Sequence, residues 1–317
     1  MYNPQNIIEV SSVYKSYRGS EKPALDGITL AVRKGSFFGL LGPNGAGKTT
    51  MLSILCTLLS PDSGDVFISG ISLKDNRTKI KGTIGYVPQD IALYPTLTAR
   101  ENLSFFGKMQ GLSGAFLKER VDFCLALANM KNLSKKRVET FSGGLKRRLS
   151  LAVGLLHSPR ILFLDEPTVG IDPQSRHFIY ESLQKMNADG MTIVYTTHYL
   201  EEVELLCDEI AIMDRGKIIS AGKVAELLAF QGQGVLEIKT DAPVSEAVEQ
   251  QLRALPGVDS VACKNKKLTL ISRSPTKTIA DVLTLFERQG IGIVSLVHGA
   301  TNLEQLFMSL TGTVLRE

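Results

Sequence analysis

Continuous and periodic hydrophobic runs alternate along the first 220 residues of the chain. Residues 36–41 form an unbroken apolar run, typical of a strand buried on both faces, and a glycine-rich turn and a helical stretch from Lys48 follow it. Residues 7–29 instead carry short alternating apolar runs, typical of an antiparallel sheet. Further strand-type runs, separated by helical segments, occur at residues 160–164, 192–196 and 209–213. This alternation predicts an α/β unit with a mostly parallel sheet.

A helical insertion interrupts this unit. After a strand-rich stretch at residues 65–87, the strand pattern disappears, and residues 98–157 look helical. Thr98 and Glu101 have the spacing of a capping box, in which each side chain binds an unpaired amide at the start of a helix. We therefore expect a helical subdomain at about residues 95–158.

A different pattern begins after residues 231–234, which show no apolar periodicity. The remainder reads as strand, helix, two strands, helix and strand, the order of ferredoxin-like domains. We therefore expect one domain at residues 1–230 and a small α+β, ferredoxin-like domain at residues 235–317. In a last expected helix, at 303–310, helical spacing favours a core role for Leu303, Leu306, Phe307 and Leu310.

Composition limits the possible classes of function. The 317 residues include 36 Lys and Arg against 32 Asp and Glu, and the formal charge of +4 is too small to indicate a nucleic-acid partner. Hydrophobic residues make up 44%, which is typical of a globular protein. Four widely separated cysteines show neither metal-ligand spacing nor a disulfide framework, and we expect buried thiols. Neither a secretory signal nor an apolar run long enough to cross a bilayer is visible.

The glycine-rich segment after the buried strand matches the phosphate-loop pattern G-x-x-x-x-G-K-[ST]. Its residues are Gly42, Pro43, Asn44, Gly45, Ala46, Gly47, Lys48 and Thr49. Glycines let successive backbone amides surround a polyphosphate, and the following helix adds the positive end of its dipole. We expect Lys48 to reach the outer phosphates and Thr49 to ligate Mg²⁺.

Two acidic residues end the apolar strand at 160–164. In a phosphate-loop protein, a carboxylate at the tip of a neighbouring strand holds Mg²⁺ or its water, which gives Asp165 a predicted role. Glu166 lies one residue further and is a candidate general base that polarises the attacking water.

A third motif, Phe141-Ser142-Gly143-Gly144, opens a helix that continues through residue 149. It resembles the family motif of ATP-binding cassette (ABC) ATPases, and further landmarks follow in the family's order. Tyr17 falls at the aromatic that stacks on adenine, Gln89 at the Q-loop, Asp172 at the D-loop and His198 at the switch histidine. The resemblance covers residues 1–230.

The resemblance implies a fold with an N-terminal antiparallel β-sheet, a RecA-like core and a helical subdomain, and it implies ATP and Mg²⁺ as cofactors. The implied ATP-binding residues are Tyr17, the phosphate loop with Thr50, Ser142, Gly143, Gly144 and Asp172. The implied Mg²⁺ ligands are Thr49, Gln89 and Asp165, and the implied catalytic residues are Glu166, His198 and Gln89.

The resemblance also implies a head-to-tail dimer. Ser142, Gly143 and Gly144 of one protomer would close over the γ-phosphate that the phosphate loop of the other protomer holds. Hydrolysis would then loosen the interface and convert chemistry into an opening stroke. Asp172 would connect the two sites, and Gln89 would link Mg²⁺ to the helical subdomain.

The signature departs from its commonest form, Leu-Ser-Gly-Gly-Gln, at both ends. Phe141 replaces the first residue, and Leu145, which we interpret as packing, replaces the last. Leu145 followed by three basic residues resembles exporter-type cassettes that pair with a separate membrane permease, and residues 298–312 are similar to the tail of many such cassettes. We interpret the basic triplet at 146–148 as a solvated helix face and residues 131–137 as an exposed basic loop.

These features favour the ATP-hydrolysing subunit of an exporter, peripheral on the cytoplasmic side of the membrane. It is expected to pair with a second ABC ATPase protomer, with a homodimer favoured, and to act on an integral permease. An importer subunit has the same chemistry and stays an alternative. A chromosome-maintenance or repair ATPase is disfavoured because no sustained heptad pattern lies between Lys48 and Ser142. A ribosome-associated cassette protein is disfavoured because only one phosphate loop is present. The cargo, the direction of transport and the choice between like and unlike protomers are left open.

Overall fold

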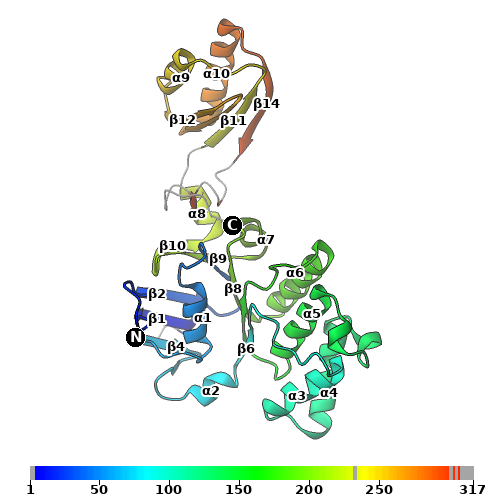
Figure 1. Ribbon diagram of the computed structural model, residues 1–317. Helices are drawn as coiled ribbons and strands as arrows, with labels where there is room; N and C mark the ends of the chain where they lie inside the picture. Colours follow the sequence, from blue (N-terminus) through cyan, green and yellow to red (C-terminus); the bar gives the residue numbers. More distant parts are fainter. Residues whose placement is uncertain (1–3, 231–233, 300–302, 304–305, 308–317) are drawn as a thin grey trace. The chain divides into compact units, whose positions relative to one another are not determined.

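The computed structural model describes residues 4–230, 234–299, 303 and 306–307, which divide into two compact units between Val224 and Ala225 (Figure 1). The division falls at the start of helix α8 (Val224–Phe230), shortly before the boundary that the sequence predicts at residues 231–234. Of that segment, residues 231–233 lie outside the described residues.

Two sheets form the framework of the first unit (Figure 1). The antiparallel sheet has the order β2-β1-β4-β5 and contains β1 (Asn6–Lys15), β2 (Leu25–Arg33), β4 (Ser63–Ile68) and β5 (Ile71–Ser72). The second sheet has the order β10-β9-β3-β8-β7-β6, and all of its neighbouring strands are parallel except β10 and β9. Its strands are β3 (Phe37–Leu41), β6 (Ile84–Val87), β7 (Ile161–Asp165), β8 (Thr192–Thr197), β9 (Glu209–Asp214) and β10 (Lys217–Lys223). Both sheets are of the types predicted.

The sequence pattern does not predict β10. The strand lies at the edge of its sheet, and most of its residues are exposed or half-buried. An edge strand of this kind has no apolar alternation to reveal it.

Helices cover the mostly parallel sheet and form the predicted insertion. The sheet's helices are α1 (Lys48–Leu55), α2 (Arg77–Lys81), α6 (Pro173–Ala188) and α7 (Leu200–Leu206). The insertion contains α3 (Ala99–Met109), α4 (Gly114–Leu127) and α5 (Gly143–Gly154), with 3₁₀ turns at Lys131–Leu133 and Val138–Thr140. The predicted capping box is present, because Thr98 accepts from the amide of Glu101 and Glu101 accepts from the amide of Thr98.

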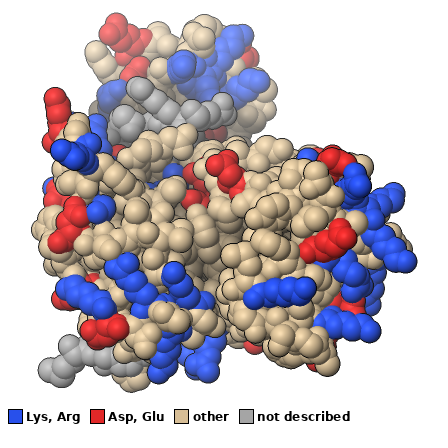
Figure 2. Space-filling view, turned by 60° about the horizontal axis from the view of Figure 1, so that its bottom comes forward, with Lys and Arg blue, Asp and Glu red and all other residues tan. Residues whose placement is uncertain are grey.

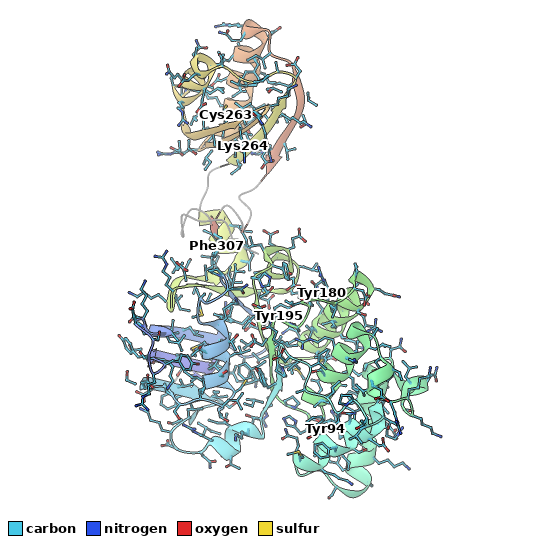
Figure 3. All side chains as sticks on the ribbon, in the orientation of Figure 1. Tyr94, Tyr180, Tyr195, Cys263, Lys264 and Phe307 are labelled. Carbon is cyan, nitrogen blue, oxygen red and sulfur yellow. The ribbon has the colours of Figure 1, made fainter. Side chains whose placement is uncertain are left out.

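Charged side chains of both signs are spread over the surface of the molecule shown in Figure 2. Residues 131–137 are mostly exposed, as predicted for a basic loop. Figure 3 labels Tyr94 at the start of the insertion. Its ring makes an edge-to-face contact with Phe105, with ring centroids 4.8 Å apart. Both of these aromatic rings remain partly exposed.

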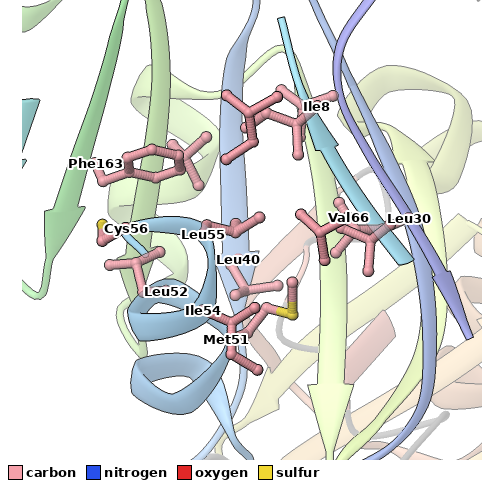
Figure 4. Packing of buried hydrophobic residues seen from close by; sticks show 14 of the residues in the cluster. Ile8, Leu30, Leu40, Met51, Leu52, Ile54, Leu55, Cys56, Val66 and Phe163 are labelled. Atoms are coloured by element: carbon pink, nitrogen blue, oxygen red, sulfur yellow. The ribbon is translucent and has the colours of Figure 1, made fainter. Parts of the chain in front are cut away.

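The main core lies between the two sheets of the first unit and is built around α1 (Figure 4). Met51 and Leu55 of α1 are buried together with Leu40 of β3 and with Ile8 and Val66 of the antiparallel sheet. Each side chain of this size that is fully buried contributes roughly 1.5–3 kcal/mol. The packing therefore fixes α1, and with it the loop that precedes α1, against the end of β3.

The second unit has the predicted ferredoxin-like order. Its elements are β11 (Gly234–Thr240), α9 (Glu246–Arg253), β12 (Val258–Lys264), β13 (Lys267–Ser272), α10 (Pro275–Gln289) and β14 (Ile293–Gly299). All neighbouring strands of its sheet, ordered β12-β13-β11-β14, are antiparallel. Leu236, Leu270, Leu252 and Phe286 form the centre of a core between the sheet and both helices.

Two smaller predictions can be compared with the structure. Leu303, Leu306 and Phe307 are helical and buried, whereas Leu310 lies outside the described residues. Three cysteines are buried as expected, but Cys263 is only half-buried. Within the described residues, no helix is long and apolar enough to cross a membrane.

Candidate functional site

Predicted site residues lie at the ends of four adjacent strands, at one edge of the sheet. The phosphate loop follows β3, His198 follows β8, the acidic pair ends β7, and Gln89 follows β6, in the spatial order β3-β8-β7-β6. Because parallel strands end at the same edge, residues far apart in the sequence meet there. Several of these residues line a cavity of about 460 Å³. Its lining includes Asn44, Gly45, Ala46, Gly47, Lys48, Thr49, Thr50, Gln89, Glu166 and His198.

The phosphate loop needs glycine for two different reasons. Gly45 and Gly47 adopt φ angles of 82° and 106°, in the left-handed region that favours glycine. A Cβ atom on Gly47 would also lie 2.5 Å from the carbonyl oxygen of Ala24, whereas a Cβ on Gly45 would meet open space. The loop therefore has a packed side toward Ala24 and an open side at Gly45.

Lys48 lies at the centre of the loop and is buried. Its ammonium donates to the carbonyl oxygens of Gly42 at 2.8 Å and Pro43 at 3.3 Å. The same nitrogen lies 3.1 Å from Oε1 of Glu166. Lys48 thus contacts both the phosphate loop and the acidic residue that follows β7.

Asp165 is buried at the tip of β7. Its Oδ1 accepts from Thr196 Oγ1 at 2.7 Å and from Thr49 Oγ1 at 3.4 Å. Burial raises the pKa of Asp165, and the Glu166 charge raises it further, while the hydroxyl donors and Lys48 oppose the shift. A buried carboxylate next to a hydroxyl is a pair of hard oxygen atoms that a divalent cation would stabilise.

Glu166 takes a φ of 42°, which a residue with a side chain rarely adopts. Its amide donates to Thr196 Oγ1 at 3.0 Å, which holds this turn on β8. His198 Nδ1 lies 3.3 Å from Glu166 Oε1, but no hydrogen bond within the described residues satisfies this buried nitrogen. The strained backbone thus directs Glu166 toward both Lys48 and His198.

Tyr17 lies outside the cavity lining and is 46% exposed. Its hydroxyl is 3.3 Å from Thr50 Oγ1, at the first turn of α1. The aromatic ring is therefore anchored beside the phosphate loop with much of its surface accessible.

The signature residues form a second group that the cavity does not include. Ser142 caps α5 by accepting from the amide of Leu145 at 3.3 Å, and Gly143 is exposed with open space where a Cβ would lie. Gly144 is instead buried, and a Cβ there would lie 2.7 Å from Oδ2 of Asp172. Asp172 itself caps α6 by accepting from the amide of Ser175 at 2.8 Å.

Sequence reasoning missed Arg147, and the interpretation of residues 146–148 as a solvated face is wrong for it. Arg147 is 3% exposed and donates to four carbonyl oxygens. These belong to Pro167 at 2.5 Å, Pro88 at 2.5 Å, Gln89 at 3.1 Å and Asp165 at 3.1 Å. Burial lowers the pKa of Arg147 to about 10, so the guanidinium stays charged at neutral pH.

A sequence signal for Arg147 does exist. Arg147 lies three residues after Gly144 and four before Leu151, so all three share one face of α5. All three residues are buried in the structure, as residues on one helix face that packs against the core would be. The neighbouring charges at Lys146 and Arg148 hide this periodicity.

A larger cavity, of about 1140 Å³, lies elsewhere in the first unit. Lys34, Arg160 and Thr192, which line it, stand at the amino-terminal ends of the parallel strands. None of the predicted site residues lines it. Size alone therefore does not mark the chemical site of this molecule.

The fold and the smaller cavity define a class, the phosphate-loop ATPases with a helical insertion. The sequence model of the ABC transporter family matches residues 25–169. A linearmycin resistance ATP-binding protein of Bacillus subtilis is 41% identical over 98% of this chain and 100% of its own length. A Nod factor export ATP-binding protein of Ralstonia nicotianae is 37% identical over 98% of this chain and 95% of its own.

Solved structures agree with these relatives. A dimeric ATP-binding cassette in a post-hydrolysis state, bound to ADP and phosphate, has 31% identity and a TM-score of 0.63, covering 68% of this chain and 98% of its own. A subunit of an ABC transporter complex of Clostridium perfringens has 28% identity and a TM-score of 0.65, covering 80% of this chain and 96% of its own. The chain belongs to the ABC transporter family. It is an ATP-binding, ATP-hydrolysing subunit of such a transporter.

Proposed function

We propose that this subunit drives export through a separate membrane permease, and that ATP closes two protomers head to tail. The observation that carries the proposed closure is the separation, on one protomer, of two groups that are predicted to bind phosphate. Lys48 and its loop line the cavity, whereas Ser142 and Gly143 lie exposed at the amino end of α5, outside that lining. Free amides and the dipole at a helix start attract anions. A second protomer would bring this group over the phosphate held by the first.

The proposed division of labour follows the geometry. Residues 42–50 hold the phosphates, and Tyr17, which is anchored on Thr50, stacks on adenine. The hydroxyl of Thr49, the carboxylate of Asp165 and the side chain of Gln89 fit Mg²⁺, which prefers oxygen ligands and usually binds through few protein groups. When bound, Mg²⁺ would neutralise phosphate charge. Among the described residues, no group of three or more His, Cys, Asp or Glu side chains is arranged so that it could hold a metal ion by itself.

Two residues are proposed to act on the attacking water. Glu166 would orient the water and accept its proton, and His198, 3.3 Å from the same carboxylate, would contact the γ-phosphate. Nδ1 of His198 makes no hydrogen bond within the described residues, although it lies 3.3 Å from Glu166 Oε1. This supports a role in the site, because a buried polar atom normally has a hydrogen-bond partner in the working state. Asp172, packed against Gly144, would carry the state of one site to the interface.

The permease is proposed to contact the helical insertion near Tyr94. Tyr94 and Phe105 are partly exposed, and Met109 and Phe116 expose more than half of their surfaces. Asn102 fixes the adjoining loop by binding the backbone of Tyr94 at both its amide and its carbonyl. Because Gln89 lies five residues before Tyr94, movement of this surface would reach the cavity directly. We propose that the subunit is peripheral on the cytoplasmic side of the membrane, where it would make this contact with the permease.

Export is favoured by the names of the relatives. They include proteins of linearmycin resistance, Nod factor export and, at 34% identity, daunorubicin resistance in Streptomyces coeruleorubidus. We infer a cargo related to the compounds in these names for this chain. In inside-out vesicles containing the chain and its permease, Mg-ATP should drive uptake of such a compound. Uptake confined to right-side-out vesicles loaded with ATP would indicate import instead.

The composite site is tested by light scattering on the Glu166→Gln variant during gel filtration. Without its base, this variant should bind ATP without completing hydrolysis, so Mg-ATP should convert it from monomer to dimer. Adding Ser142→Arg places a bulky cation at the exposed end of α5 and should keep the protein monomeric in Mg-ATP. A dimer in both conditions, or none in either, contradicts the proposed closure.

A further inference from the structure

Four hydroxyl groups surround one buried carboxylate in the first unit. Glu202 of α7 is 3% exposed, and its Oε1 accepts from Thr168 Oγ1 and, at 2.7 Å, from the hydroxyl of Tyr180. Its Oε2 accepts from the hydroxyl of Tyr195 at 2.9 Å and from Thr197 Oγ1 at 2.7 Å. Figure 3 labels Tyr180 and Tyr195, which lie near each other in this region. None of these residues was singled out by its sequence pattern.

In this cluster, hydroxyl groups take the place of the Lys or Arg that usually pairs with a buried carboxylate. A buried charge costs free energy unless polar groups compensate for it. Within the described residues, no Lys or Arg forms an ion pair with Glu202, and its hydrogen-bond donors are all hydroxyls. Burial, and then the Glu202 charge, raise the pKa of Tyr195 well above its ordinary value, so this phenol stays protonated as a donor.

The donors belong to segments that lead to residues of the candidate site. Thr168 lies two residues after Glu166, on the way to Asp172. Tyr180 belongs to α6, the helix that Asp172 caps. Tyr195 and Thr197 belong to β8, and Thr197 directly precedes His198. The Glu202 carboxylate therefore binds both the segment next to His198 and the segment that follows Glu166.

We propose that Glu202 is a positioning residue that couples His198 to the segment between Glu166 and Asp172. Thr197 Oγ1 donates to Glu202 and accepts from the amide of Tyr199 at 2.9 Å, so both flanks of His198 are tied to the carboxylate. Thr168 ties the other segment to the same group. A shift of His198 on nucleotide binding is then transmitted to the D-loop. This inference rests on the roles proposed above for His198 and Asp172.

The substitution Glu202→Gln tests the coupling at nearly constant volume. A carboxylate only accepts hydrogen bonds, and here it satisfies four donors. The amide nitrogen of Gln would instead face two hydroxyls, so these must rotate or lose a partner. Glu201→Gln is the matched control, because Glu201 is on the same helix, is exposed, and loses the same charge.

Binding and turnover should separate in Glu202→Gln. None of the five residues of the cluster lines the cavity of about 460 Å³ in which ATP is proposed to bind. The dissociation constant for Mg-ATP should therefore stay within about twofold of wild type. The value of kcat should fall about tenfold or more with little change in KM, because His198 loses its alignment. Glu201→Gln should match wild type in both. An unchanged kcat in folded Glu202→Gln overturns the proposal.

A double-mutant cycle with His198→Ala distinguishes positioning from a general structural effect. If Glu202 acts through His198, adding Glu202→Gln to His198→Ala should lower kcat little further. Multiplicative losses would mean that Glu202 acts independently, and they would overturn the inference. Full activity of His198→Ala itself would contradict the proposed function, a result distinct from a silent Glu202 variant.

A second variant keeps the test valid if Glu202→Gln does not fold. Tyr180→Phe retains the ring and removes one donor, and the melting transition should remain cooperative. Its kcat should fall by about twofold to fivefold, again without a further loss in the His198→Ala background. A folded Tyr180→Phe variant with wild-type kcat, or with losses that multiply in the cycle, overturns the proposal.

Discussion

The ammonium of Lys48 lies 3.1 Å from Oε1 of Glu166, and both side chains are buried. The cation expected to bind phosphate and the expected general base thus form an ion pair with each other. A phosphate that draws Lys48 toward itself would leave Glu166 with His198, whose Nδ1 is 3.3 Å from the same oxygen. If the proposed roles hold, phosphate binding and release of the base would be linked through one ion pair.

Lys48→Ala should weaken ATP binding. Loss of a charged hydrogen-bond donor to phosphate costs about 1.5–3 kcal/mol, which corresponds to a roughly tenfold to hundredfold higher dissociation constant. Titration calorimetry with Mg-ATP measures this change directly. Glu166→Gln is the control, because it breaks the same ion pair from the other side and should retain affinity. Tight binding by Lys48→Ala would contradict the phosphate-loop assignment.

Mixed protomers should restore activity if Ser142 works across the interface. Lys48→Ala and Ser142→Arg should each be nearly inactive alone, since every site in the homodimer lacks one half. A mixture contains heterodimers in which one composite site keeps both Lys48 and Ser142 intact. ATP hydrolysis in an equimolar mixture should therefore exceed that of either variant. A silent mixture would argue against shared sites.

The sequence predicts the fold and the cavity well because their signals are local. Gly45 and Gly47 are required by positive φ angles, and apolar strands ending in Asp165 or His198 position chemistry at one sheet edge. The βαββαβ order of the second unit is likewise visible as a sequence of short periodic runs. Such features depend on residues that are neighbours in the chain.

Long-range polar contacts are what the sequence does not reveal. Arg147 binds carbonyls up to 59 residues away, and Glu202 collects hydroxyls from positions 168 to 197. In both cases a second charged residue is adjacent on the same helix, Lys146 beside Arg147 and Glu201 beside Glu202, and this run of charge suggests a solvated face. Only the packing of α5 and α7 against the sheet makes these residues buried.

Arg147→Leu should destabilise the chain and weaken turnover. The change leaves four carbonyl oxygens without their donor, and each unsatisfied buried group costs about 1–3 kcal/mol before relaxation. Because two of these carbonyls belong to Pro88 and Gln89, the Q-loop should also loosen. Urea unfolding measures the first effect, and the ATPase rate at saturating ATP measures the second.

Lys146→Leu provides the comparison for Arg147→Leu. Lys146 precedes Arg147 on α5, is only half-buried, and loses the same charge. We expect its free energy of unfolding to stay within about 0.5 kcal/mol of the wild-type value. Equal destabilisation by the two variants would mean that helix charge matters, not the four carbonyl contacts.

The pH dependence of stability should reveal the burial of Asp165. Because burial raises its pKa above the unfolded value of about 3.9, ionised Asp165 destabilises the fold, and this cost fades as pH falls toward that value. Asp165→Asn should thus raise the urea midpoint at pH 7, with a gain that shrinks in acid.

Asp62 provides the comparison, because its pKa shift has the opposite sign. A hydrogen bond from Lys15 lowers the pKa of Asp62, so Asp62→Asn should lower the urea midpoint at pH 7, and the loss should fade as pH falls through the folded pKa. Equal signs for the two variants would contradict the assigned burial of Asp165.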